Sequence, residues 1–445
     1  MKRWLIFAEG GTAGLFDPLD ALRPPYLLRN GAWTVADRWI RLLEPTDIAA
    51  YTRLSLAEAL ADHTAWTVNQ TPDGRPDDVW IVTGAPSPRP DLRWDGLHFP
   101  VAFTSSRGPH CVMRLDQPAW DRRKFDLTAW LTIAGTGPIP KAPESTLLDE
   151  PPFATPDGLW DLVNSLALQI GFDAEIWTKM NGRGEGPDQS RQDSTVLISP
   201  EKLWIGRDVQ IGPHTVIDAS SGPVILDAGV VIEPFTRLEG PAFVGAHTRL
   251  VGGKISGGCA FGPGCRLGGE IEASIIQGFA NKVHEGYFGH GFMGEWVNLG
   301  AMTTNSDLKN NYGSVRVTRL GQTVDTGCLK AGSYLADHTK TAIGTLLPTG
   351  STTGVGVNLL SGGLAPKSIP PFVWGGSGRF TEHRLDRMLD TARAAMARRS
   401  VMLKMANRAD QLSGGEEKAL RALFSASAEP RAAFLQEQNS PSDRD

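Results

Sequence analysis

The chain has 445 residues, of which 41% are hydrophobic and 21% charged, with a net charge of −5 and a pI near 6.0. This composition is typical of a soluble globular protein, and the length predicts two or three domains instead of one core. The weak negative charge and the lack of a basic stripe give no field for a polyanion, which argues against nucleic acid as a partner.

The N-terminal segment Trp4–Ala8 is predicted to form a first buried strand. Only about six apolar residues precede Glu9, too few for the apolar core of a signal peptide. No stretch approaches the roughly 20 apolar residues of a membrane-spanning helix. The cysteines form no CxxC pair, so we expect a cytoplasmic protein with free thiols and no membrane contact. They are Cys111, Cys259, Cys265 and Cys328.

Residues 1–190 alternate short apolar strands with helical patterns, which predicts an α/β layer domain. The expected strands are Trp4–Ala8, Val79–Thr83 and Trp130–Ile133, and the expected helices are Ile48–Leu60 and Gly158–Ile170. A polar, glycine-rich stretch from Asn181 to Pro187 indicates a linker to the next domain.

Bulky side chains recur every six residues in the second half of the chain, which neither the 3.6-residue period of a helix nor the two-residue period of a strand explains. Three hexapeptides make one triangular coil, so residues about eighteen apart stack along its axis. The period predicts a left-handed parallel β-helix over residues 195–378. The repeating residues are Ile205, Ile211, Ile217, Leu226, Ile232, Leu238, Val244, Leu250, Ile255, Phe261 and Leu267.

The C-terminal part returns to a helical period. Apolar residues from Leu385 to Met396 are spaced as on one face of a helix, and a second short helix is expected through Leu420–Phe424. C-terminal helices are therefore predicted over residues 379–426. The polar residues 427–445 are predicted to form a disordered tail.

One segment between the coils is rich in polar side chains. It contains His284 and Tyr287, then Asn298-Leu299-Gly300-Ala301-Met302-Thr303, then Asn310-Asn311-Tyr312-Gly313. It resembles the acetyltransferase half of the bifunctional enzyme that makes UDP-N-acetylglucosamine. That family has a His, a Tyr three residues later and an Asn fourteen residues after the His, and its active-site carboxylate falls on Glu270 here.

A second resemblance is to a subgroup of sugar nucleotidyltransferases with a similar β-helix. The chain is similar to them at Gly268–Glu272, Leu308–Gly313 and Asp337–Thr341. Their N-terminal signature resembles Leu22–Gly31, in which Arg23 and Arg29 are expected phosphate ligands because a guanidinium binds phosphate through two parallel hydrogen bonds. An equal alternative is that both are surface arginines of a proline-rich loop.

These resemblances imply roles for individual residues. Transfer of an acyl group from a thioester to an amine needs a base with a near-neutral pKa, and His284 is the predicted base, with Glu270 and Asn298 as further catalytic residues. The substrate would be bound by Lys282, Tyr287, Asn311, Tyr312 and Arg316, besides Arg23 and Arg29. The acetyl-CoA co-substrate would be bound by Ala301, His338 and Lys340.

The chain departs from the family pattern at several positions. Glu272 replaces a lysine that binds the sugar phosphate, His290 replaces an aspartate, and Met302 replaces a glycine. The loop Glu9–Gly14 has neither the arginine nor the lysine expected after the first strand of a nucleotidyltransferase, whose phosphates it would bind through backbone N–H groups.

The sequence therefore predicts an α/β nucleotidyltransferase-like domain, a left-handed β-helix and C-terminal helices. The expected function is a transferase acting on a sugar phosphate or amino sugar, with acyl transfer from acetyl-CoA at the β-helix of a homotrimer. One alternative is nucleotidyl transfer alone, with Mg²⁺, and another is a non-catalytic scaffold or sugar-nucleotide sensor. Zinc bound by His284, His290 and His338, as in β-helix carbonic anhydrases, is disfavoured by the spacing, and no metal site is predicted.

Overall fold

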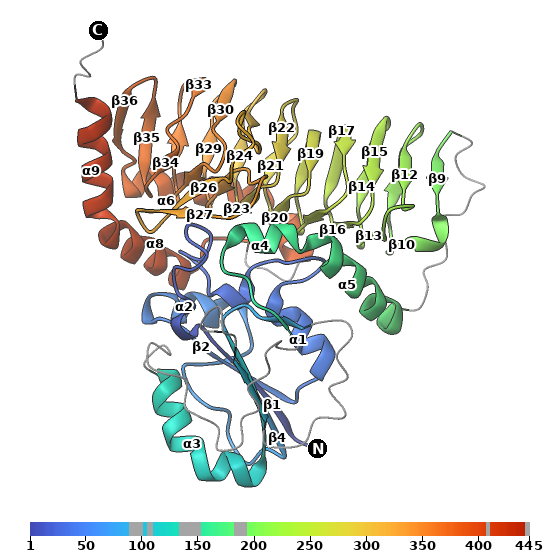
Figure 1. The fold of residues 1–445 in the computed structure, drawn as a ribbon, viewed down its shortest axis with the longest axis vertical. Coiled ribbons are helices and arrows are strands. Elements are labelled where there is room, and N and C mark those ends of the chain that lie inside the picture. Colours follow the sequence, from blue (N-terminus) through green and yellow to red (C-terminus); the bar gives the residue numbers. More distant parts are fainter. Residues whose placement is uncertain (89–100, 105–109, 133–152, 182–193, 406–409, 441–445) are drawn as a thin grey trace.

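The computed structural model describes residues 1–88, 101–104, 110–132, 153–181, 194–405 and 410–440. An α/β domain lies against one side of a long β-helix, and the C-terminal helices pack along several coils of the β-helix, over one of its ends and against the α/β domain (Figure 1). The expected linker lies almost wholly outside the described residues.

The α/β domain is built on a six-stranded sheet with the order β3-β2-β1-β4-β7-β6. Strands β1 to β4 are parallel, and β7 runs antiparallel to both of its neighbours. Every residue of β4 is buried, as expected for a strand in the middle of a covered sheet. The bounds are β1 Arg3–Ala8, β2 Asp47–Tyr51, β3 Thr67–Val68, β4 Asp78–Thr83, β6 Val101–Thr104 and β7 Cys111–Asp116, with the small pair β5 Ser87–Pro88 and β8 Phe153–Ala154.

The described part of this domain contains the helices α1 Val35–Leu43, α2 Leu54–His63, α3 Gln117–Thr132, α4 Leu159–Asn164 and α5 Leu166–Asn181, of which α5 contacts β16 and β18 of the β-helix. Thr34 and Asp37 form a capping box at the start of α1. A fully buried ion pair joins α1 to α5, with Arg38 Nε 2.7 Å from Asp173 Oδ1 and Arg38 Nη2 2.9 Å from Asp173 Oδ2.

Two predictions in this domain were wrong, and a third was partly right. Residues 48–51 belong to β2 because they pair with β1, and helix α2 starts only at Leu54. The expected strand at Trp130 is the end of helix α3, in which Leu127, Trp130 and Leu131 share one buried face. The expected helix Gly158–Ile170 is two helices, α4 and α5, interrupted at Ser165.

Residues 196–376 form the predicted left-handed parallel β-helix, whose strands stack in three faces. The first face is a nine-stranded sheet of β10 Leu203–Ile205, β13 Val224–Leu226, β16 Ala242–Val244, β18 Cys259–Phe261, β20 Ile275–Gly278, β23 Phe292–Glu295, β28 Tyr334–Leu335, β31 Thr352–Thr353 and β34 Ser368–Ile369. The second face contains β11 Gln210–Ile211, β14 Val231–Ile232, β17 Arg249–Ile255, β19 Arg266–Glu272, β21 Asn281–Lys282, β24 Asn298–Leu299, β29 Lys340–Thr341, β32 Asn358–Leu359 and β35 Val373–Gly376.

The third face is formed by β9 Val196–Ile198, β12 Val216–Asp218, β15 Thr236–Glu239, the second halves of β17 and β19, β22 Tyr287–Gly289, β25 Thr304–Asn305, β30 Thr345–Leu347 and β33 Gly363–Leu364. β17 and β19 pass through a corner, with a register shift between Leu250 and Gly253. A hairpin of β26 Arg316–Arg319 and β27 Gln322–Asp325 extends from the coils. The predicted repeat residues fill the axis or pack against its core.

The α/β domain covers the first face of the β-helix. In β13, Val224 and Leu226 point into the coil, whereas Ile225 packs in the core shared with the α/β domain, as does Phe243 of β16. The alternation follows from the two-residue period of a strand. Only two faces of the prism therefore remain for contacts with other molecules.

The C-terminal helices are α6 Leu385–Ala397, α7 Ser400–Met405, α8 Gly414–Ala426 and α9 Ala428–Asn439. Helix α8 packs on α2, where Lys418 Nζ lies 2.5 Å from Glu58 Oε2. The expected disordered tail 427–445 differs from the structure, because residues 428–439 form α9, which caps the β-helix. A few buried residues of α9 are enough to order this helix. Phe434 packs on Phe380 of the strand β36 Arg379–Glu382, and Arg431 pairs with Glu382. Residues 441–445 are outside the described part.

No helix in the described ranges is both long and apolar enough to cross a membrane.

Candidate functional site

The predicted base, His284, lies at the corner between β21 and β22, where the chain passes from the second to the third face. Its side chain is exposed and makes no hydrogen bond or ion pair with the described residues. The corner itself is held by Lys282, whose ammonium donates to the carbonyl oxygens of Gly268 (2.9 Å), His284 (3.2 Å) and Gly286 (2.6 Å).

Lys282 is therefore not available to a substrate in this structure. It is only 2% exposed, all three of its N–H donors are used by carbonyls, and burial lowers its pKa to about 8. Its buried ammonium group instead holds the backbone of the His284 corner in place.

Exposed polar side chains flank this corner on both faces. On the second face, Asn298 accepts a hydrogen bond from Asn281 at 3.0 Å, and it is in register with the half-buried Lys340 of the next coil. On the third face, Glu270 pairs with Lys254 at 2.7 Å. The predicted residues His284, Asn298 and Glu270 thus lie around one corner.

Tyr287 is the centre of a network that the sequence did not predict. Its hydroxyl lies 2.9 Å from Asp307 Oδ2 and 3.1 Å from Glu272 Oε2. Lys330 bridges the same two carboxylates, at 3.3 Å from Glu272 and 3.6 Å from Asp307. Burial and both carboxylates raise the pKa of Tyr287 well above its usual value.

His290 completes this network, with Nδ1 2.8 Å from Asp307 Oδ2. Oδ2 thus lies within hydrogen-bond distance of Nδ1 but off the direction of the ring N–H, and the contact is an ion pair only when the imidazole is protonated. Burial alone would raise the pKa of Asp307, but His290 and Tyr287 beside it lower this pKa to about 2. Glu272, His290 and Asp307 are spaced 18 and 17 residues apart, so the coil period was the signal that could have found them.

The remaining predicted substrate residues lie in the loop before the hairpin. Tyr312 is 72% exposed, and the side chain of Asn311 accepts a hydrogen bond from Gly313 within the loop. Arg316, at the start of β26, is exposed. No hydrogen bond or ion pair joins these three residues to His284 within the described part of the chain.

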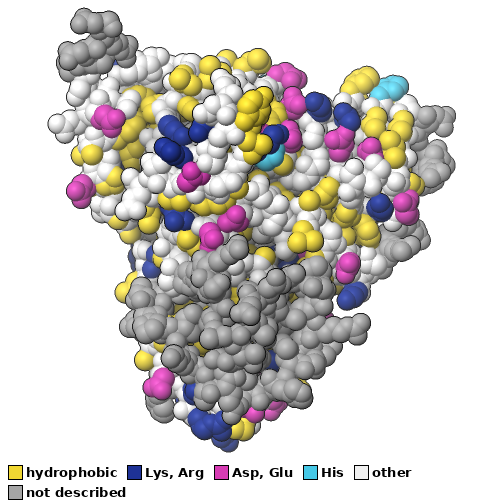
Figure 2. Space-filling view, viewed as in Figure 1, with side chains coloured by type: hydrophobic (Ala, Val, Ile, Leu, Met, Phe, Trp, Pro, Cys, Tyr) yellow, Lys and Arg dark blue, Asp and Glu magenta, His cyan; other side chains and the backbone are white. Residues whose placement is uncertain are grey.

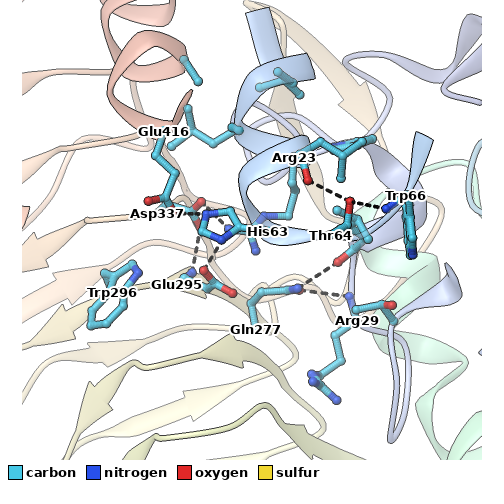
Figure 3. A pocket seen from close by; sticks show the side chains of 18 of the residues that line it. Arg23, Arg29, His63, Thr64, Trp66, Gln277, Glu295, Trp296, Asp337 and Glu416 are labelled. Carbon is cyan, nitrogen blue, oxygen red and sulfur yellow. Dashed lines mark hydrogen bonds and ion pairs between the residues drawn. The ribbon is translucent and has the colours of Figure 1, made fainter. Parts of the chain in front are cut away.

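Arg23, Arg29 and His338 line a cavity of about 650 Å³ between the α/β domain, the β-helix and the C-terminal helices (Figure 3). Trp66 and Trp296 stand on opposite sides of this view. The sequence assigned the arginines to a substrate site and His338 to a cofactor site, whereas the structure places all three around one cavity.

The charged groups of this cavity are largely paired with one another. Arg23 Nη2 lies 2.5 Å from Asp337 and 3.7 Å from Glu295 of the β-helix, and burial raises the pKa of Asp337 to about 6. Arg29 is buried and donates to the carbonyl oxygens of Gly31 and Ala32. Neither arginine is a surface residue, so that alternative was wrong, and both have protein partners where a phosphate was expected.

The predicted acetyl-CoA residues do not converge. Burial lowers the pKa of His338 to about 3, and its ring stacks on Trp296 inside the cavity. Lys340 is half-buried on the second face, and Ala301 accepts a backbone hydrogen bond from Gly344. Met302 has φ 62°, a left-handed conformation that explains why the related family has glycine at this position.

The loop after β1 is covered by the hairpin of the β-helix. It forms a short 3₁₀ helix at Gly10–Thr12 and is followed by Gly14, where an added Cβ would lie 2.8 Å from the side chain of Leu320. Leu320 N donates to Asp17, and Arg319 donates to the carbonyl oxygens of Leu15 and Asp157. The place expected for nucleotide phosphates is therefore a docking surface for β26 and β27.

The described residues contain no group of three or more His, Cys, Asp or Glu side chains arranged to bind a metal ion. His284, His290 and His338 occupy separate places: an exposed corner, the Tyr287 network and the cavity.

No protein-family model matches the chain. The bifunctional protein GlmU of Rippkaea orientalis is 26% identical over 211 residues, covering 38% of this chain and 45% of that protein. The GlmU protein of Carboxydothermus hydrogenoformans is 28% identical over 148 residues, covering 28% of this chain and 33% of that protein. The chain thus spans less than half the length of these curated relatives, and the expected resemblance to a bifunctional enzyme is confirmed at low identity.

Among solved structures, an Arabidopsis UDP-N-acetylglucosamine acyltransferase aligns with 57% of this chain and 98% of its own length, at 13% identity and a TM-score of 0.30. A TM-score this low supports no conclusion about function.

Proposed function

We propose that the protein transfers an acyl group from acetyl-CoA to the amine of an amino sugar or sugar phosphate at the β-helix. The observation that carries the proposal is the His284 corner. The buried Lys282 holds its backbone, and Asn298 and Glu270 flank it on the second and third faces. The similarity of the chain to bifunctional GlmU proteins supports the same reaction class.

The reaction requires one proton transfer and one acyl transfer. A histidine accepts a proton from the substrate ammonium group, and the free amine attacks the thioester carbonyl. The C–N bond forms, the C–S bond breaks, and the departing thiolate takes up a proton. Asn298 would hydrogen-bond the acceptor, and His284 is accessible to a substrate too large to enter a cavity.

We further propose a homotrimer, because the β-helix leaves apolar side chains exposed away from the α/β domain. Leu346 and Leu364 are neighbours in adjacent strands and are 43% and 76% exposed, and Ile343 and Leu360 are more than half exposed. Figure 2 shows hydrophobic groups interspersed with charged ones on this side of the β-helix. Cyclic assembly would bury such a surface.

Nucleotidyl transfer is not proposed. The loop after β1 contacts Leu320, and Arg23 and Arg29 bind groups of the protein itself. Mg²⁺ was expected only with that activity and has no place in the proposed reaction.

The test is direct. The full chain is incubated with acetyl-CoA and a set of amino sugars, their 1-phosphates and UDP- and dTDP-linked forms, and acetylated products are detected by mass spectrometry. We expect Asn298→Ala to lower kcat/KM by about 10-fold or more, because it removes a polar contact from the acceptor. His214→Gln is the matched control, since His214 is an exposed histidine at another corner. No product with any acceptor would refute the proposal.

A further inference from the structure

A second histidine has the surroundings that a proton acceptor requires. His290 follows β22 at the next corner of the same coil, and its side chain is only 14% exposed. Its backbone adopts φ 49°, and its N–H donates to the Glu272 carbonyl oxygen of the preceding coil at 3.1 Å. The backbone of the coil therefore fixes the direction in which the side chain of His290 leaves the chain.

The imidazole is held on one edge by a carboxylate. Nδ1 lies 2.8 Å from Asp307 Oδ2, the oxygen that also accepts the hydroxyl hydrogen of Tyr287 and faces Lys330. A carboxylate on Nδ1 favours a proton on that nitrogen and leaves Nε2 as the basic nitrogen. His284 has no such partner, so neither its tautomer nor its orientation is fixed.

The ring of His290 also lines a groove of about 460 Å³. One wall is formed by Val163 and Asn164 of α4 and Leu166 of α5, from the α/β domain, and the other by coil corners that include Gly257 and Ala273. The groove is therefore complete within one chain, and it gives the α/β domain a part in a site on the β-helix.

The charges of the groove indicate what it binds. Its ionisable lining residues are Asp218, Glu239 and His290, with no lysine or arginine among them. Glu239 is paired with Arg237, and Asp218 accepts the backbone N–H of Ser220 at 2.9 Å and also interacts with the Ser220 side chain and the Arg237 charge. Such a lining repels a phosphate and favours a ligand that carries an ammonium group.

The two histidines stand at opposite ends of β22, His284 in the corner before this strand and His290 in the corner after it. They are therefore two distinct positions for a proton acceptor on one coil.

We propose that His290 is the general base of the transferase, that Asp307 is its positioning residue, and that the groove between α4–α5 and the coil corners binds the amino group of an unphosphorylated amino sugar. This inference rests on the proposed acyl transfer for its reaction. Nε2 of His290 takes the ammonium proton, the amine forms the C–N bond as the C–S bond breaks, and the proton passes to the departing thiolate.

The geometric part is tested without any assay of activity. Long-range ¹H–¹⁵N spectra of the histidine rings in the full chain identify the His290 signals by their absence in His290→Gln. We expect a neutral ring protonated on Nδ1, and we expect Asp307→Asn to abolish that preference. A ring protonated on Nε2 in the wild type would overturn the assignment.

The catalytic part uses the acetylation assay with glucosamine as acceptor. We expect His290→Gln to lower kcat by about 10²- to 10⁴-fold, the usual effect of losing a general base, with KM for acetyl-CoA unchanged. Asp307→Asn should shift the pH profile of kcat, which a merely structural role would leave in place. His214→Gln, at an exposed histidine outside both corners, should stay within twofold of the wild type.

The outcomes separate the two proposals. If the wild type acetylates glucosamine while His290→Gln, folded by its melting curve, retains its rate, the base assignment is wrong. If His284→Gln alone loses activity, the base is the sequence-predicted His284. If the wild type acetylates no amine, the proposed function fails, and the ring spectra still decide whether His290 has the predicted tautomer.

Discussion

The Arg38–Asp173 pair gives the sharpest prediction for stability. Both side chains are fully buried and are joined by two contacts of 2.7 and 2.9 Å, and Asp173 Oδ2 also accepts the Ala32 N–H at 2.7 Å. Asp173→Ala would leave the guanidinium buried without a counter-charge. Breaking a buried ion pair in this way costs about 3–5 kcal/mol, and we expect a loss of that size in the free energy of unfolding.

The measurement is guanidinium unfolding followed by tryptophan fluorescence, which reports on this region because Trp33 and Trp177 stack 5.9 Å apart between the loop before α1 and α5. The transition of the α/β domain is fitted separately, since a chain of several parts need not unfold in one step. The double change Arg38→Met with Asp173→Leu is the control, because replacing both charges by apolar groups is near neutral. A loss below about 1 kcal/mol in Asp173→Ala would refute the reasoning.

Three further predictions follow from assembly and titration. Light scattering should give a mass near 144 kDa, three times the 48.0 kDa chain, and a monomer would exclude the trimer. Burial raises the pKa of Asp20 to about 7, so the folded state holds this proton more tightly than the unfolded chain, and stability should fall as the pH rises from about 4 to 7. Asp20→Asn should flatten that fall in melting temperature, whereas Asp390→Asn on the surface should not. Burial raises the pKa of Cys259 to about 12 and of Cys265 to about 11, so a thiol reagent at pH 8 should label the half-buried Cys328 first; early labelling of the buried pair would contradict this.

The β-helix was predictable because each coil repeats the same local requirement. A six-residue period places one bulky side chain on the axis, and residues such as Leu226 and Phe261 are buried where the period put them. The errors fell where long-range contacts decide. Ile48 is in a strand because β1 lies beside it, and α9 is ordered because Phe434 finds Phe380. No local pattern contains those partners.

The candidate site was predictable only in part. His284 and Asn298 could be placed by spacing, and the structure does put them around one corner. The role of Lys282 could not be predicted, because the carbonyl oxygens that bind its ammonium group belong to the backbone of two coils. The cavity between Arg23 and His338 joins residues more than 300 positions apart, so it exists only once the domains have docked.

The contact between α9 and β36 covers a strand edge at one end of the β-helix. β36 is the last strand of its sheet, and an uncovered last strand offers free N–H and C=O groups to any extended chain. Asn439 binds both edge groups of Phe380. Its side-chain oxygen accepts the Phe380 N–H at 3.0 Å, and its side-chain amide donates to the Phe380 carbonyl oxygen at 2.7 Å. A chain shortened to residue 426 would lose this cover and expose an edge on which further chains could add as filaments. The twelve residues of α9 would thus block the pairing of a second chain with this edge.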